Sequence, residues 1–206
     1  MKTLHRRNRL RLLAVAGVAA AIGTVPGTQT AIAAPPGPAA ARGDADVAAA
    51  VPADVRSFQK DLKDVTPGPG FVPASAYLAH GTQTYTCTAV GQWPTSGSVP
   101  EATLVRVGRP GDTVHHYAGP RWEAKDGSIV HGVVPPRRQV ARSGTIPWLL
   151  LDVTHEGSPG ALTPVTNVSR ILTSGGLPPS GTCVPGSITS PEYRAVYVFW
   201  VPTRRS

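Results

Sequence analysis

The chain has 206 residues, of which 20 are Lys or Arg and 12 are Asp or Glu, so its formal net charge is +8. Five of the basic residues and none of the acidic residues fall within residues 1–33, which leaves 15 basic and 12 acidic residues, a net charge of +3, in the remainder. So small a charge excludes the dense basic surface that nucleic-acid binding needs, and we expect no nucleic-acid partner.

Residues 1–33 show the order of features that is typical of a secretory signal peptide. Basic residues precede an apolar run at residues 12–25, and Ala31 and Ala33 supply the small side chains expected before a cleavage site after Ala33. The apolar run is too short and too rich in Ala and Gly to form a membrane span. We therefore expect a secreted or extracellular mature chain without a transmembrane segment, which can associate with the cell wall. Arg6 and Arg7 leave the twin-arginine export route open.

Two short segments precede the main domain. Residues 34–50 are rich in Ala, Pro and Gly, which predicts a disordered linker. In residues 51–66 apolar side chains recur at alternating spacings of four and three, which is typical of a short amphipathic helix. The recurring apolar residues are Val51, Val55, Phe58, Leu62 and Val65. Because the polar face mixes acidic and basic residues, we expect this helix or irregular arm to pack on the domain rather than on a membrane.

Residues 67–203 have the pattern of short strands separated by Gly, Pro and Ser. Strict alternation places Gln83, Tyr85 and Cys87 on one face of a strand and threonines on the other. Further strands are expected at 102–107, 146–153, 165–173 and 193–201. The last of these is apolar on both faces, so it should be central. No helical pattern intervenes, and the sequence predicts one all-β domain, a single antiparallel sandwich or a partly closed barrel.

The polar stretch at residues 115–132 predicts a β-hairpin. Asp126 and Gly127 form the pair preferred in a two-residue type I′ turn, with a positive φ at the glycine. This turn would place Trp122 opposite His131. Cross-strand neighbours should then bury the Trp122 side chain.

A search for catalytic and metal-binding patterns predicts neither a cofactor nor a metal, and it assigns no catalytic residue. His115 and His116 are adjacent, so in a strand they point to opposite faces, and the local spacings of zinc sites are absent. A metal set of His116 and His131 with Asp126 or Glu123 is the alternative. The motifs G-x-S-x-G, H-E-x-x-H and G-x-G-x-x-G do not occur. A dispersed catalytic triad stays open, because such triads are recognised in space.

Cys87 and Cys183 are the only two cysteines of the chain. Export would place them in an oxidising compartment. Cys87 lies in a predicted strand and Cys183 follows turn residues, so both can be held near the core. We predict that they form a disulfide bond.

Five segments of the β-domain carry a resemblance to a known family. These segments are residues 79–87, 119–132, 146–153, 170–183 and 193–200. They resemble the secreted family catalogued as domain of unknown function 3455, and the resemblance covers residues 67–202. It implies no established activity and supplies no catalytic residue.

The remaining observations favour a binding module for a glycan, a small ligand or a cell-surface partner. Aromatic side chains near turns can stack on a sugar ring or cover an apolar patch of a partner. The candidate ligand-binding residues are Trp93, Tyr117, Trp122, His116 and Glu123. The alternatives are a structural or interaction protein of the envelope or matrix and, as a third class, a secreted hydrolase.

Overall fold

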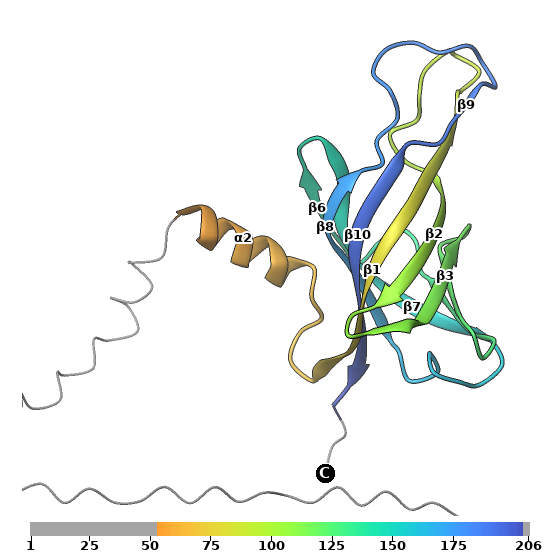
Figure 1. Ribbon diagram of the computed structural model, residues 1–206. Helices are drawn as coiled ribbons and strands as arrows, with labels where there is room; N and C mark the ends of the chain where they lie inside the picture. Colours follow the sequence, from red (N-terminus) through yellow and green to blue (C-terminus); the bar gives the residue numbers. More distant parts are fainter. Residues whose placement is uncertain (1–52, 204–206) are drawn as a thin grey trace, which may run out of the picture. The chain divides into compact units, whose positions relative to one another are not determined.

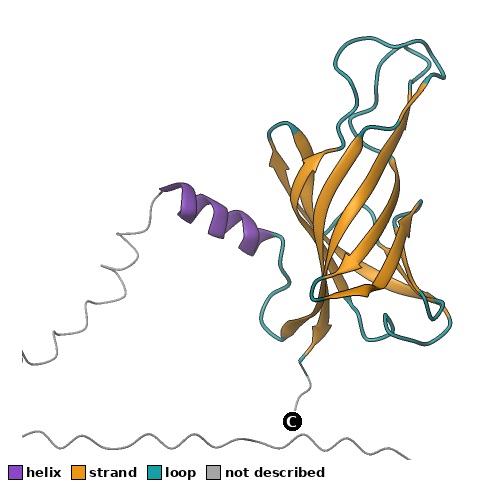
Figure 2. Ribbon diagram, viewed as in Figure 1, coloured by secondary structure: helices purple, strands orange, loops and turns teal. Residues whose placement is uncertain are grey.

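The structure is a computed structural model that describes residues 53–203 (Figure 1). The predicted signal peptide and linker, residues 1–50, lie outside the described residues. The elements are α2 (Ala53–Asp64), β1 (Phe71–Thr86), β2 (Val99–Arg106), β3 (Arg109–Tyr117), β4 (Arg121–Ala124), β5 (Ser128–Gly132), β6 (Arg138–Arg142), β7 (Thr145–Gly157), β8 (Asn167–Gly175), β9 (Ile188–Thr189) and β10 (Glu192–Pro202). The predicted all-β class with a short N-terminal helix is confirmed (Figure 2).

Eight of the strands form a closed antiparallel barrel rather than a sandwich. The strand order is β10-β8-β7-β5-β4-β3-β2-β1, and the pairing of β1 with β10 closes the ring. Strand β6 pairs with β7, and β9 pairs with β1, outside this ring. Closure leaves no free edge in the ring, and an eight-stranded barrel is wide enough to be filled by side chains or to hold one small ligand.

Strand β1 shows why alternation predicts the barrel wall. Gln83, Tyr85 and Cys87 are buried, while Thr84 and Thr86 face outward, as the period of two requires. A second constraint comes from Gly81, where an added Cβ would lie 2.1 Å from the carbonyl oxygen of Glu101 on β2. A glycine at this position therefore allows β1 and β2 to approach closely.

Helix α2 covers part of the outer face of the barrel, next to β6 and β7. The Phe58 ring meets the Trp148 ring edge-on at a centroid distance of 5.6 Å. Arg142 lies over the same Trp148 ring and donates a 2.6 Å hydrogen bond to Asp61. Below the helix, Val65 is fully buried in a small core outside the barrel. These contacts confirm the predicted packing of this segment on the domain. Helix α2 is too short and too polar to cross a membrane.

Strand β10 is apolar on both faces because each face contacts a different core. Tyr197 and Phe199 point into the barrel interior. Val196 and Val198 pack against the outer core that also includes Leu62 of α2. Since β10 pairs with β8 on one side and with β1 on the other, the predicted central position is correct.

The hairpin of β4 and β5 exists, but its predicted register is wrong by one residue. Trp122 pairs with Val130, not with His131. The connection is a three-residue loop in which the Gly127 N–H donates to the carbonyl of Ala124, and Gly127 has the expected positive φ of 79°. Asp126 supports this loop by accepting a 3.0 Å hydrogen bond from the Ser128 N–H.

The corrected register exchanges the two faces of β5. Val130 is fully buried and Ser128 is 2% exposed, whereas Ile129 and His131 face outward. The predicted burial of Trp122 is confirmed, since its side chain is 1% exposed. Burial of the apolar Val130 in the core therefore sets the register, and it outweighs the preference of the turn residues for a two-residue turn.

The conformation of Gly127 leads to a stability prediction. We expect Gly127→Val to lower the free energy of unfolding by about 1 kcal/mol or more, because a β-branched residue is strained at positive φ. Gly111→Val in β3 is the matched control, since an added Cβ at Gly111 also meets no atom within 4 Å but the residue has no positive φ. Urea denaturation of the two variants measures the difference. Equal midpoints would contradict this account of the turn.

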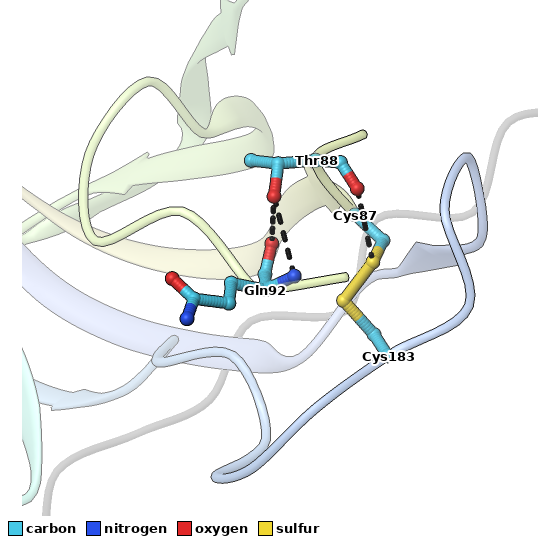
Figure 3. The surroundings of a disulfide bond; sticks show 4 residues. All are labelled: Cys87, Thr88, Gln92 and Cys183. Atoms are coloured by element: carbon cyan, nitrogen blue, oxygen red, sulfur yellow. Dashed lines mark hydrogen bonds between the residues drawn. A yellow bond between two sulfur atoms is a disulfide. The ribbon is translucent and has the colours of Figure 1, made fainter. Parts of the chain in front are cut away.

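The predicted disulfide between Cys87 and Cys183 is present, with a Cα–Cα distance of 6.0 Å (Figure 3). It joins the end of β1 to the segment between β8 and β9. Backbone hydrogen bonds flank it, from the Cys183 N–H to the carbonyl of Gly91 and from the Cys87 N–H to the carbonyl of Ser187. Next to it, the Thr88 hydroxyl donates a 2.8 Å hydrogen bond to the carbonyl of Gln92.

Candidate functional site

A cavity of about 400 Å³ lies within the barrel and is the candidate functional site. Its size falls in the range of small-molecule sites, roughly 300–1,000 Å³. The strand residues that line it are Gln83, Tyr85, Pro100, His116, Trp122, Gln139, Ile146, Pro147, Leu149, Leu151, Arg170 and Tyr197. Loop residues 95–98, 119–120, 134, 136 and 177 complete the lining. Inward-facing side chains from most strands of the ring thus converge on one space.

Three aromatic rings that contact one another form one wall of the cavity. The imidazole of His116 lies parallel to the Trp122 ring, with a centroid distance of 4.6 Å and an angle of 3°. Tyr197 meets both rings edge-on, at 5.2 Å from His116 and 5.8 Å from Trp122. Such aromatic pairs contribute beyond their buried area, so this wall is held in a defined geometry.

His116 is neutral at physiological pH. Its side chain is 2% exposed, and this burial lowers its pKa from 6.5 to about 3. The Nδ1 atom lies 2.8 Å from the carbonyl oxygen of Arg121. Since a carbonyl can only accept, Nδ1 carries the proton and Nε2 remains a hydrogen-bond acceptor.

Two buried donors of the cavity lining have no hydrogen-bond partner among the described residues. They are Nε1 of Trp122 and Nε2 of Gln83, on side chains that are 1% and 2% exposed. The Gln83 Oε1 atom is engaged, because it accepts a 2.6 Å hydrogen bond from the Ser98 hydroxyl. Gln83 also lies near the Tyr193 hydroxyl, where it opposes the rise in pKa that burial causes. This contact does not meet hydrogen-bond geometry. Buried donors of this kind are uncommon and call for an explanation.

Arg170 supplies the charge of the cavity. Its Nε and Nη2 atoms donate to the carbonyl of Pro147 at 3.1 and 3.0 Å, which fixes the guanidinium at the wall. Its positive charge also affects the pKa values of titratable groups around the cavity. Burial raises the pKa of the Tyr85 hydroxyl and Arg170 opposes that rise, whereas both burial and Arg170 lower the pKa of His116.

The structure separates the five ligand-binding residues expected from the sequence. Trp122 and His116 line the cavity together. Tyr117 lies outside it and stacks on His115 at 4.9 Å. Glu123 is on the outer face of β4, across from His115, and Trp93 belongs to the loop that follows Cys87. Tyr117, Glu123 and Trp93 therefore do not belong to the lining of this cavity.

Residues Gln83, Arg170 and Tyr197 complete the site and were not expected there. The alternation of β1 does place Gln83 on the inner face, and a glutamine on a buried face is a signal for a polar site. Arg170 carries a similar signal, because it is a charged residue between the buried Val168 and Ile171 of β8. Which side chains converge on one cavity depends on the closure of the barrel, which no local pattern reveals.

The alternative metal set does not converge. His116 points into the barrel, while His131 faces outward and its Nδ1 atom lies 3.2 Å from Glu156 on β7. Within residues 53–203, no group of three or more His, Cys, Asp or Glu side chains could hold a metal ion.

The fold and the site define the chain as an eight-stranded antiparallel barrel protein with an internal cavity. Residues 107–201, which span β3 to β10, match the family model described as "Protein of unknown function (DUF3455)". The predicted resemblance is thus confirmed over residues 107–201, which include four of the five segments, while residues 79–87 lie outside the match. No curated protein and no solved structure matches the chain.

Proposed function

We propose that the protein is a binding protein that holds one small organic molecule inside its barrel. The observation that carries this proposal is the cavity of about 400 Å³ with the unpartnered donors of Trp122 and Gln83 in its lining. A cavity with mostly apolar walls and a few convergent polar groups is the usual form of a small-molecule site. A ligand oxygen that reaches either donor would satisfy a group that otherwise costs free energy.

Among the ligand classes expected from the sequence, the cavity favours the small ligand. A glycan or a surface partner would be met by aromatic side chains on the outside of the domain, such as Trp93 and Tyr117. The aromatic wall of His116, Trp122 and Tyr197 instead lines the cavity and can pack against one side of a small molecule.

We further propose that the protein works outside the cytoplasm. The buried disulfide between Cys87 and Cys183 is compatible with an oxidising compartment. The signal-peptide pattern of residues 1–33 supports the same location. N-terminal sequencing of protein recovered from the culture medium tests this proposal, with Ala34 expected as the first residue.

A fragment screen tests the binding function. We expect members of a diverse panel of small molecules to raise the melting temperature and to bind one per chain in native mass spectrometry, because a ligand that binds only the folded state stabilises it. Leu149→Trp should abolish this binding, since Leu149 lines the cavity and the larger ring fills the ligand space.

Leu78→Trp is the matched control for that screen. Leu78 lies on the outer face of β1, is 57% exposed and does not line the cavity, so this variant should bind like the wild type. The proposal is wrong if no fragment binds the wild-type chain, or if the fragments bind the Leu149→Trp variant equally well.

A further inference from the structure

We propose, on the basis of the binding function above, that the ligand is a small organic acid whose carboxylate pairs with Arg170 and whose apolar body fills the barrel cavity. Three features of the described residues carry this inference: the unbalanced charge of the cavity, the free edge of the Arg170 guanidinium and the mixture of polar and apolar residues in the lining.

The cavity has one charged side chain and no counter-charge. Arg170 is the only Lys, Arg, Asp or Glu among its lining residues, and no carboxylate of the described residues lies within 4.0 Å of the guanidinium. His116 does not add to the charge, because burial keeps it neutral. An anion in this space therefore meets an unpaired cation, whereas a cationic ligand would meet repulsion.

The guanidinium presents the edge that a carboxylate needs. Nε and one N–H of Nη2 point to the Pro147 carbonyl, which uses one side of the planar group. The second N–H of Nη2 and the N–H groups of Nη1 remain, and together they form the fork that binds a carboxylate through two parallel hydrogen bonds. The bond to Pro147 also orders the side chain before the ligand arrives, which reduces the entropy lost on binding.

The rest of the lining matches an acid with an apolar body. Nε1 of Trp122 and Nε2 of Gln83 are donors without partners, so they favour ligand oxygens over ligand N–H groups. Ile146, Leu149 and Leu151 supply an apolar surface for the remainder of the molecule. The carboxylate should lie at Arg170 because a charged group is expensive to bury without a partner.

Matched pairs of acids and amides test the inference on the wild-type protein. The probes are hexanoate with hexanamide, phenylacetate with phenylacetamide, and phenylpropionate with phenylpropionamide, each titrated by calorimetry. Within a pair the two molecules have nearly the same shape and differ in charge. We expect the acid to bind about tenfold tighter than its amide, which corresponds to one charge-assisted contact. Added salt should weaken the binding of the acid more than that of the amide.

Variants at Arg170 locate the preference. Arg170→Gln should bring acid and amide to equal affinity, and Arg170→Lys should keep part of the preference because it keeps the charge but loses the fork. Arg138→Gln is the matched control, since Arg138 on β6 is exposed and outside the cavity lining, so its loss removes a charge without removing the site. Circular dichroism verifies the fold of each variant. If Arg170→Gln does not fold, the comparison of acid with amide on the wild type and the same comparison on Arg170→Lys still test the inference.

The outcomes distinguish the two proposals. Equal binding of acid and amide to the wild type would overturn the anionic ligand and leave the binding function intact. A preference for acids that survives in Arg170→Gln would overturn the role of Arg170. The fragment screen decides the binding function separately, and a screen in which no molecule binds would overturn both proposals.

Discussion

Replacing both Cys87 and Cys183 with serine is expected to lower the free energy of unfolding by about 4–5 kcal/mol. The two cysteines are 96 residues apart, so their bond closes a long loop and restricts the unfolded chain strongly. A domain of ordinary stability has roughly 5–15 kcal/mol in total, and the loss would therefore be visible at room temperature. Urea denaturation of the purified β-domain, monitored by circular dichroism, measures it.

Reduction of the wild type provides the matched control. The reduced wild-type protein, either single serine variant and the double variant should all unfold at nearly the same urea concentration, and only the oxidised wild type should be more stable. Reductant should leave the double variant unchanged. An oxidised wild type that unfolds together with the double variant would show that the bond does not stabilise the fold.

The sequence predicts the individual strands better than their assembly. The alternation in β1 and the two apolar faces of β10 are local patterns, because side chains in a strand alternate between two environments. Closure of the barrel depends on the pairing of β1 with β10, in which Tyr77 lies opposite Tyr197. The sequence contains no local signal for a contact between residues so far apart, so a sandwich and a barrel could not be distinguished.

The hairpin register shows how the core overrides a turn preference. Asp126 and Gly127 favour a two-residue turn by their composition, yet the same pair also fits a three-residue loop that ends in a glycine of positive φ. The two loops differ by one residue in register, and this shift decides whether Val130 or His131 points into the barrel. Burying Val130 instead of His131 avoids the desolvation of a second polar ring.

The candidate site could be predicted only in part. Trp122 was expected to be buried, and His116 was expected on a strand, but their stacking arises from the pairing of His116 with Trp122 across β3 and β4. Arg170 reaches the same cavity from β8. Its role depends on the absence of acidic side chains from a lining drawn from several strands, which becomes evident only in the three-dimensional structure.

Lowering the pH from 7 to 5 is expected to remove about 2 kcal/mol of stability through His116 alone. The folded protein holds the pKa of His116 at about 3, against 6.5 for an unburied histidine. The unfolded chain therefore binds a proton as the pH falls through 6.5, while the folded chain does not. Stability that is present above pH 6.5 is lost as the pH falls towards 3, where the folded state also takes up the proton.

Acidic residues act in a lower pH window and can be separated from His116. The pKa of Asp126 is lowered, mainly by the Ser128 hydroxyl, and the pKa of Glu156 is lowered, mainly by Arg121. Both carboxylates contribute stability that is present above their ordinary values of 3.8 and 4.5 and is lost below them. A change in stability between pH 7 and 5 therefore reports on histidines and not on these two carboxylates.

The variant His116→Phe isolates this contribution, because phenylalanine can keep the ring stack on Trp122 but does not titrate. The variant can be less stable than the wild type at pH 7, since it leaves the Arg121 carbonyl without its donor. Its loss between pH 7 and 5 should nevertheless be smaller than that of the wild type by about 2 kcal/mol. His155→Gln, at an exposed histidine, should keep the wild-type pH dependence. If His116→Phe loses as much stability over this interval as the wild type does, His116 is protonated in the folded barrel, and the neutral acceptor at the cavity wall is wrong.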